Sequence, residues 1–323
     1  MKAIQVVDEE LNWSEFEDPA VADNDVLIKV HATAINRADL MQRRGFYPPP
    51  PGSSPIMGLE CAGEVIETGR SAGRYKVGDQ VCALLPGGGY AELAAVDEGS
   101  VLPVPKGLTM TQAAGLPEVF ATAWLNIFME AGLQPGEKVI IHAGASGVGT
   151  AAIQLCKAFG SSSFVTVGSA EKLATCLSLG ADAGSNRHDG PFMASAREFA
   201  GEAGVGVILD PVGAGYLADN VSLLGVGGRL VLIGLMSGAT AEINLGELMI
   251  KRARVIGSTL RPRPLTEKAQ VMAQLEEKVW PKIESGDIKA IVDKVFPVQE
   301  MAAAHDLVAS DTTIGKVILE VGR

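Results

Sequence analysis

The sequence predicts an α/β protein of two domains, with a β-rich domain first and a parallel sheet after it. The chain of 323 residues is longer than a single hydrophobic core usually serves. In the first third, short apolar runs are separated by glycine and proline, which is typical of small β-rich domains. From about residue 119 onward, apolar strand patterns alternate with amphipathic helical ones, which favours a parallel sheet buried on both faces.

The composition disfavours several classes of partner. The net charge is −11 and no run is rich in lysine or arginine, so nucleic acid and anionic membranes are disfavoured as partners. No apolar stretch of the sequence is long enough to span a bilayer, and residues 1–7 read as a strand rather than as a signal peptide. The cysteines are scattered without a CxxC pair, which indicates neither disulfides nor a zinc knuckle. We therefore expect a soluble, cytoplasmic protein.

The order of apolar runs predicts the individual elements. In the β-rich part, strands are predicted over residues 26–30, 62–68 and 76–85, with a stiff extended segment at the four prolines 48–51. Next come helix 119–130, strand 138–143, a helix from 148, strand 163–167, helix 171–179, strand 205–210, helix 214–224 and strand 229–234. The tail predicts helical segments over 266–285 and 300–309 and a strand over 316–321. The pattern permits this last strand to rejoin the first domain without requiring it.

A glycine-rich turn in residues 142–155 (HAGASGVGTAAIQL) is the strongest chemical signal. Gly144, Gly147 and Gly149 follow a strand and precede a helix, with GxxGxG spacing that is a variant of the dinucleotide-binding fingerprint. Glycine lets the backbone approach a pyrophosphate, and the free N–H groups at the start of the helix attract it. A tight turn needs glycine in any case, but the strand–turn–helix context favours dinucleotide binding.

The end of the following strand predicts NADPH rather than NADH as the cofactor. An NAD site usually places an acidic residue there to bond the ribose 2′-hydroxyl, whereas this chain has Gly168 and Ser169. Lys172 and Arg187 follow, and both are suited to pair with a 2′-phosphate. The alternative for both is an ordinary solvated surface cation.

Six stretches distributed over the whole chain carry a family resemblance. They are NRADLMQRRGFYPPPPGSSP (36–55), GLECAGEV (58–65), KVGDQVCALLPGGGYAE (76–92), AAGLPEVFATAW (113–124), HAGASGVGTAAIQL (142–155) and IGKVILE (314–320). In these stretches the chain resembles the zinc-free quinone oxidoreductase branch of the medium-chain dehydrogenase/reductase superfamily. Within that branch it most resembles the tumour-suppressor-induced, zeta-crystallin-like type.

The resemblance implies a domain arrangement and an assembly. It implies a GroES-like catalytic domain, formed by residues 1–118 and 288–323, in which a Rossmann NADPH-binding domain of residues 119–287 is inserted. Relatives in this branch pair through their Rossmann sheets, so a homodimer is expected. Residues 229–236 (RLVLIGLM) are predicted as the edge strand that needs covering.

The resemblance also argues against a metal. Zinc-dependent relatives have a cysteine at the position of Asn36 and a histidine at the position of Leu59, and neither replacement substitutes for a zinc ligand. Glu60 is retained, and Cys61 lies one position away from any ligand role. We expect Cys61 to be a small buried apolar residue.

Without zinc, neutral donors must stabilise the negative charge that develops on the acceptor oxygen. In the family, the residues matching Tyr47 and Asn36 face the acceptor and offer a phenol and an amide. The alternatives are a ring packed on a proline loop for Tyr47 and a turn residue bonded to its own backbone for Asn36. Asp39 is expected to fix the local loop, and His142 to pack on the strand that enters the glycine turn.

The glycine turn and the resemblance together assign a set of cofactor contacts. For Gly234 the alternative is a turn at a strand end, and for Lys316 it is a solvated edge charge. The assigned residues are Thr122, Gly144, Ala145, Ser146, Gly147, Val148, Gly149, Gly168, Ser169, Lys172, Arg187, Pro211, Val212, Gly213, Gly234, Leu235, Met236, Leu260, Arg261, Pro262 and Lys316.

Three functions fit this set of residues. The first is zinc-independent hydride transfer from NADPH to a small-molecule quinone, and the second is NADPH-dependent reduction of the double bond of an alkenal or enone. Only the acceptor pocket separates these two. The third is a non-enzymatic NADPH-binding role of the kind found in lens crystallins, against which Asn36 and Tyr47 favour an enzyme.

Overall fold

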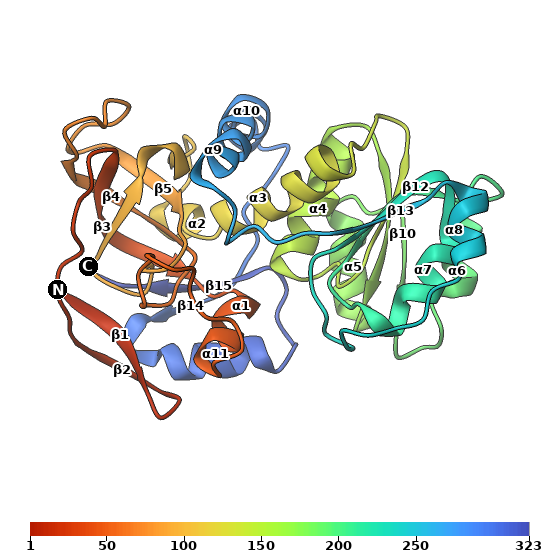
Figure 1. The fold of residues 1–323 in the computed structure, drawn as a ribbon, viewed down its shortest axis with the longest axis horizontal. Helices are drawn as coiled ribbons and strands as arrows, with labels where there is room; N and C mark the ends of the chain where they lie inside the picture. Colours follow the sequence, from red (N-terminus) through yellow and green to blue (C-terminus); the bar gives the residue numbers. More distant parts are fainter. Residues whose placement is uncertain (323) are drawn as a thin grey trace. The chain divides into compact units, whose positions relative to one another are not determined.

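The computed structural model describes residues 1–322, which separate into two compact units (Figure 1). The first unit comprises residues 1–121 and 260–322, and the second comprises residues 122–259. The predicted fold class, a parallel Rossmann-type sheet with a separate β-rich domain, is confirmed. Within residues 1–322, no helix has the length and apolar character needed to cross a membrane.

The second unit is built on a six-stranded parallel sheet with helices on both faces (Figure 1). The strand order β10-β9-β8-β11-β12-β13 starts in the middle of the sheet and proceeds outward in both directions, as in dinucleotide-binding Rossmann domains. The central strands are almost wholly buried, because helices cover them on both faces. Ligands of such sheets bind beyond the carboxyl ends of the strands where the order reverses, here between β8 and β11.

The elements of the second unit follow the alternation predicted from the sequence, with one further strand and helix, β10 (Ala183–Asn186) and α6 (Met193–Ala200), between the predicted helix 171–179 and strand 205–210. Its strands are β8 (Lys138–Ile141), β9 (Ser162–Val167), β10 (Ala183–Asn186), β11 (Val205–Asp210), β12 (Leu224–Leu232) and β13 (Arg254–Gly257). Its helical segments are η2 (Leu125–Glu130), α4 (Gly147–Ala158), α5 (Ala170–Leu179), α6 (Met193–Ala200), η3 (Ala214–Tyr216), α7 (Leu217–Leu223) and α8 (Leu245–Lys251).

The prediction that residues 229–236 form the edge strand is wrong. Residues 229–232 belong to β12, which pairs with β11 on one side and with β13 on the other. The edge is β13, which the apolar pattern does not predict because its four residues, RVIG, remain largely exposed. The short helix α8 before it also escapes prediction, since it buries none of its residues.

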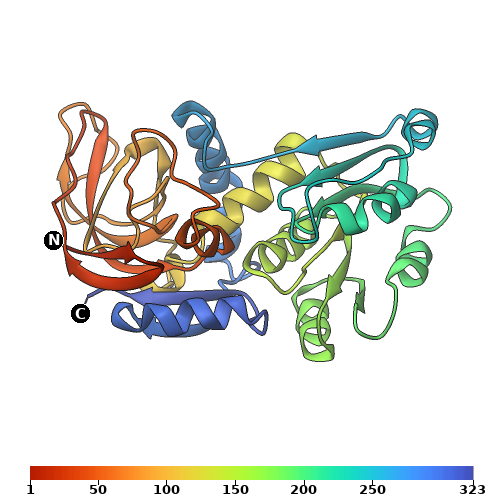
Figure 2. The same ribbon diagram turned by 60° about the horizontal axis from the view of Figure 1, so that its bottom comes forward.

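The first unit is built on a seven-stranded sheet that joins both ends of the chain. The strand order is β14-β15-β3-β4-β5-β7, and β6 also pairs with β3. Strand β15 runs antiparallel to β3, with Ile318 opposite Ala34, so the tail rejoins the N-terminal part. Helix α11 lies along the β1–β2 hairpin (Figure 2).

The bounds of the first unit's elements are as follows. Its strands are β1 (Lys2–Val7), β2 (Glu10–Glu15), β3 (Asp25–Ala34), β4 (Glu60–Thr68), β5 (Gln80–Leu84), β6 (Leu93–Asp97), β7 (Val101–Pro103), β14 (Val292–Pro297) and β15 (Lys316–Glu320). Its helical segments are α1 (Arg37–Arg43), η1 (Glu98–Ser100), α2 (Met110–Ala113), α3 (Pro117–Trp124), α9 (Leu265–Gln274), η4 (Leu275–Val279), α10 (Trp280–Glu284), η5 (Val298–Glu300) and α11 (Met301–Ala309), and the unit boundary falls within α3.

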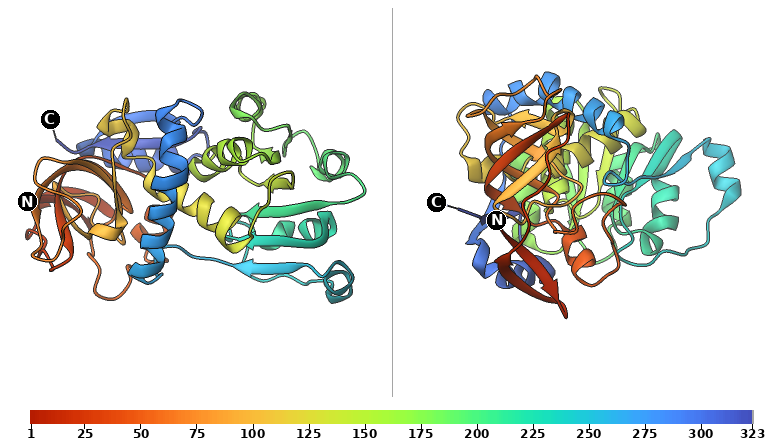
Figure 3. Two further views of the ribbon diagram at one scale, coloured as in Figure 1. Left: turned by 90° about the horizontal axis from the view of Figure 1, so that it is seen from above. Right: turned by 60° about the vertical axis from the view of Figure 1, so that its left-hand side comes forward.

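Residues 260–287 lie in the first unit, whereas the sequence-based boundary at residue 288 assigns them to the second. Helix α9 packs on η1, and α9, η4 and α10 form one continuous helical rod (Figure 3). The indole nitrogen of Trp280 donates to the Pro103 carbonyl at 2.7 Å, and the backbone N–H of Lys106 donates to the Glu284 carboxylate at 3.1 Å. These contacts with the β-rich core decide the assignment, and helical periodicity alone does not reveal them.

Candidate functional site

At two positions of the glycine turn after β8 there is no space for any side chain, so only glycine fits. A Cβ atom on Gly144 would lie 2.7 Å from the Cβ of Val165, and one on Gly149 would lie 2.5 Å from the Ala143 carbonyl oxygen. Ala143 itself adopts a left-handed φ of 53°, which is strained for a residue with a side chain. The turn therefore brings the backbone of β8 directly onto the start of α4.

Helix α4 presents its amino end at this turn. Ser146 is the N-cap, and its side chain accepts a hydrogen bond from the Gly149 N–H at 3.0 Å. The twelve-residue helix directs its remaining free N–H groups and the positive end of its dipole into the turn. A bare backbone at the amino end of a helix fits the pyrophosphate of a dinucleotide.

A buried network of hydrogen bonds lies next to the glycine turn and begins at His142, which precedes it. His142 bonds Thr166 through Nδ1 at 2.9 Å and Asn220 through Nε2 at 2.7 Å, and Asn220 donates to Asp210 at 2.9 Å. Since the Asn220 carbonyl oxygen only accepts, Nε2 carries the proton and Nδ1 accepts from the Thr166 hydroxyl. Burial lowers the pKa of His142 to about 4, so the ring is neutral.

This network extends to a second predicted cofactor segment. The Asp210 carboxylate accepts from the backbone N–H groups of Val212 and Gly213 at 2.5 and 3.1 Å, which fixes the turn after β11. The sequence predicts only a packing role for His142, whereas in the structure its ring also links two side chains by hydrogen bonds. Each of three neighbouring strands has a polar residue at its carboxyl end or directly after it (His142, Thr166 and Asp210), and this is the signal that could have revealed the network.

The structure also brings together two other predicted cofactor segments. A Cβ on Gly234 would lie 2.7 Å from the Pro211 carbonyl oxygen, and the Met236 N–H donates to that oxygen at 3.3 Å. Residues 211–213 and 234–236 therefore lie side by side after β11 and β12. Thr122 uses its backbone carbonyl to accept from the Asn126 side chain at 2.7 Å, within the helix.

The predicted phosphate-binding residues lie around the end of β9, where Gly168 and Ser169 stand in place of an acidic residue. A Cβ on Gly168 would lie 3.2 Å from the Arg187 guanidinium, so this cation lies against the strand end. Ser169 caps α5 by accepting from the Lys172 N–H at 3.2 Å. Lys172 is half-buried and Arg187 is exposed. The end of β9 therefore has a cation, Arg187, packed against it.

In the first unit, a buried ion pair holds Asn36. The Lys316 ammonium donates to the Glu60 carboxylate at 2.8 Å, to the Asn36 amide oxygen at 2.6 Å and to the Ile35 carbonyl at 2.8 Å. The Asn36 amide nitrogen donates to the same Glu60 oxygen at 2.9 Å. Glu60 is fully buried and Lys316 is only 5% exposed, so Lys316 is not the solvated edge charge of the alternative interpretation. Its three N–H donors match three acceptors.

The donor set around Asn36 does not fit zinc. Leu59 offers no ligand atom, and the amide oxygen of Asn36 accepts from a lysine cation. Cys61 is fully buried, and burial raises the pKa of its thiol to about 12, which opposes the thiolate that a metal would need. Among residues 1–322, no cluster of three histidine, cysteine or acidic side chains could hold a metal ion.

Asp39 fixes the loop before α1. Its carboxylate accepts from the backbone N–H of Asn36 at 2.8 Å and from that of Gly58 at 3.2 Å. The side chain is fully buried, and this burial raises its pKa to about 6 in spite of these bonds. Asp39 therefore holds the segments that carry Asn36 and Leu59 together.

Arg261 positions the loop that carries Tyr47. Its guanidinium donates to the Pro86 carbonyl at 2.7 Å, to the Gln42 amide oxygen at 2.8 Å and to the Tyr47 carbonyl at 3.4 Å, and its carbon lies 5.3 Å from the centre of the Tyr47 ring. Arg261 is 4% exposed and Tyr47 is half-buried. Burial raises the pKa of the phenol, and Glu118 raises it further, so the phenol remains a donor at neutral pH. The sequence assigns Arg261 only a cofactor contact and misses this role, because its partners are distant along the chain.

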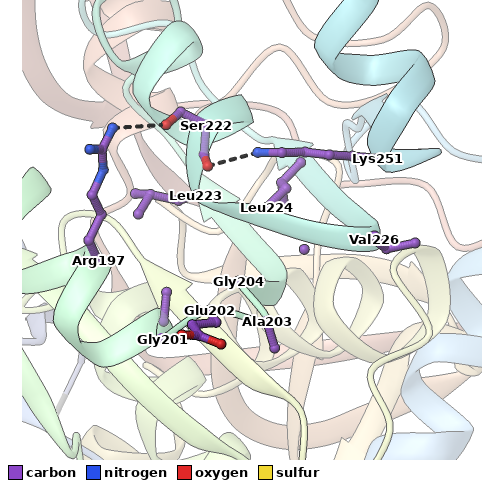
Figure 4. A pocket seen from close by; sticks show the side chains of 12 residues that line it. Arg197, Gly201, Glu202, Ala203, Gly204, Ser222, Leu223, Leu224, Val226 and Lys251 are labelled. Carbon is purple, nitrogen blue, oxygen red and sulfur yellow. Dashed lines mark hydrogen bonds between the residues drawn. The ribbon is translucent and has the colours of Figure 1, made fainter.

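A hollow of about 250 Å³ lies elsewhere in the second unit and contains none of the predicted site residues (Figure 4). It opens beside Val205, at the amino end of β11, whereas the glycine turn is at the carboxyl ends of the strands. Its two cations are already bonded: Arg197 donates to the Ser222 hydroxyl at 3.3 Å, and Lys251 donates to the Ser222 carbonyl at 2.7 Å. This hollow is therefore not the cofactor site.

Comparison with known proteins gives matches over both units. Residues 22–106 match the alcohol dehydrogenase GroES-like domain, and residues 147–277 match the family described as zinc-binding dehydrogenase. The quinone oxidoreductase of Rattus norvegicus is 32% identical over 303 residues, which cover 93% of this chain and 90% of the rat protein.

Two solved structures resemble the whole chain. The quinone oxidoreductase of Escherichia coli, complexed with NADPH, has a TM-score of 0.87 and 28% identity, and the match covers 99% of this chain and 100% of that one. The CurK enoyl reductase has a TM-score of 0.84 and 28% identity, with 99% of each chain covered.

Proposed function

The chain belongs to the medium-chain dehydrogenase/reductase superfamily of oxidoreductases, and we propose that it transfers hydride from NADPH to a quinone without a metal. The observation that carries the proposal is the Lys316–Glu60–Asn36 cluster at the position where zinc-dependent relatives have ligands. NADPH supplies the hydride when bound. Similarity to quinone oxidoreductases over more than nine-tenths of the chain supports a quinone as the acceptor.

The proposed acceptor site stabilises charge through neutral donors. Hydride addition leaves negative charge on the acceptor oxygen, which preorganised donors stabilise in a site that excludes water. In this proposal the Tyr47 phenol donates to that oxygen, held in place by Arg261. Asn36 has one amide N–H bonded to Glu60 and a second one to offer.

Reduction of an enone or alkenal is the second candidate. Similarity to the CurK enoyl reductase favours it, and it uses the same cofactor and the same charge on the acceptor oxygen. NADPH oxidation against a panel of ortho-quinones, para-quinones and alkenals distinguishes the two. Turnover of quinones alone supports the first function, and turnover of alkenals alone supports the second.

We further propose a homodimer that covers β13 and α8. Met249 and Ile250 on α8 are 78% and 81% exposed, and β13 is an unpaired edge of the parallel sheet. Light scattering should give twice the chain mass for the wild type. Ile250→Glu should shift the protein to monomers. The control Leu177→Glu, at an exposed position on α5, should not. A wild-type monomer at micromolar concentration would contradict the dimer.

Replacing Tyr47 with phenylalanine should lower kcat with a quinone by about tenfold or more, because a hydrogen bond to developing charge contributes about 1.5–3 kcal/mol. The KM for NADPH should change little, since the phenol is not expected to contact the cofactor. Tyr75→Phe is the matched control, because that phenol bonds the Val101 carbonyl in the same unit. Steady-state kinetics of both variants measures the effect, and wild-type kinetics in Tyr47→Phe would leave Tyr47 only a packing role.

NADPH should bind at least about tenfold more tightly than NADH, because one charge-assisted bond to the 2′-phosphate contributes about 1.5–3 kcal/mol. Lys172→Ala and Arg187→Ala should each reduce this preference while barely changing NADH affinity, and salt should weaken it. Lys157→Ala, an exposed cation on α4, is the control. Calorimetric titration with both cofactors decides, and equal affinities in the wild type would refute the assignment.

A further inference from the structure

Glu118 lies against the buried ion pair of the first unit. It follows Pro117 at the start of α3, and its backbone N–H donates to the Glu60 carboxylate at 3.0 Å. The amino end of α3, where a helix stabilises an anion best, therefore already binds the Glu60 carboxylate. The half-buried side chain of Glu118 is thus the third carboxyl group of a cluster that also contains Glu60 and Asp39.

The three carboxyl groups differ in the hydrogen bonds that they accept. Glu60 accepts from the Lys316 ammonium, from the Asn36 amide and from the Glu118 N–H, and Asp39 accepts from two backbone N–H groups. Glu60 is therefore one half of an ion pair, and the two backbone donors lower the pKa of Asp39 against the larger effect of its burial. In the part of the chain that the structure describes, no donor bonds to the Glu118 carboxyl.

The surroundings of Glu118 favour its neutral, protonated form. Burial is the largest cause and the charge of Glu60 the next, and together they raise its pKa from 4.5 to about 8. Asp39 raises the pKa further, whereas Lys316 and Arg261 lower it. The charge of Glu118 in turn raises the pKa of two other ionisable groups of the first unit, Lys268 on α9 and Tyr47 on the loop. The protonated form of Glu118 is therefore favoured well above the pH at which a carboxyl group usually ionises.

The other ionisable groups of the cluster are less suited to exchange a proton. Asp39 is fully buried and bonded to two backbone N–H groups. Burial raises the pKa of Tyr47, so its phenol donates a hydrogen bond but does not remain as a phenolate.

We propose that Glu118 is the proton store of the acceptor site. This inference rests on the proposed reductase function. The hydride takes its electron pair from NADPH to the acceptor, which gains two electrons and places negative charge on its oxygen. The O–H bond of Glu118 then breaks, its proton goes to that oxygen, and water reprotonates the carboxylate, so that NADPH, one proton and the acceptor yield NADP⁺ and the reduced acceptor.

The pH profile of kcat tests the proton store. Wild-type kcat should fall as the pH rises above about 8, because the store empties. Glu118→Gln keeps the size of the side chain but carries no acidic proton. It should lower kcat at pH 7 by about 10²-fold and abolish the alkaline fall. Glu17→Gln, at an exposed position, is the control and should match the wild type. An unchanged alkaline fall in Glu118→Gln would overturn the proposal, even with a lower kcat, since it would indicate a purely structural role.

The pH dependence of Tm provides a readout that needs no acceptor. A raised pKa means that the folded state holds the proton more tightly than the unfolded state, so wild-type stability falls as the pH rises from 4.5 towards 8. The Tm of Glu118→Gln relative to the wild type should therefore increase over this range, and that of Glu17→Gln should not. A flat difference with an active wild type would overturn only the proton store. A wild type that oxidises NADPH with no acceptor would defeat the proposed function itself.

Discussion

The buried Lys316–Glu60 pair is the constraint on which the first unit depends. It joins the last strand to β4, to the start of α1 through Asn36 and to the start of α3 through the Glu118 N–H. Removing two charges from water is costly, and only complete hydrogen bonding offsets the cost. Here three acceptors surround the ammonium. Removal of either partner would leave a buried charge uncompensated, at a cost of about 3–5 kcal/mol.

The same pair determines the chemistry that the cluster can perform. Because Lys316 takes the place beside Asn36, the amide is held by a cation and a carboxylate instead of by a metal. Burial, and after it the charge of Glu60, raises the pKa of Glu118 to about 8, which favours the protonated form of that carboxyl group. The predicted cofactor site of the second unit is held by a hydrogen-bond network instead of an ion pair. The hydrogen bonds of His142, which is neutral, connect the ends of three strands and fix the turns there.

The sequence predicts the parts of the structure that depend on local pattern. The central strands, the glycine turn and the residues at Gly168 and Ser169 are readable because each is a short apolar run or a fixed spacing. Strand β13 is not readable, since it is four residues long and largely exposed. The partners of Lys316 and Arg261 are not readable either, because these side chains meet residues from the opposite end of the chain and no periodicity records such contacts.

Metal-free hydride transfer is the central claim, and a kinetic isotope effect on chelator-treated protein tests it most directly. NADPH carrying deuterium at the transferred position of the nicotinamide is compared with ordinary NADPH, with a quinone as the acceptor and the zinc content measured in the same sample. We expect undiminished oxidation of ordinary NADPH in the absence of zinc and slower oxidation of the deuterated cofactor. Activity that disappears with the removal of zinc and returns on its addition would show that hydride transfer needs the metal.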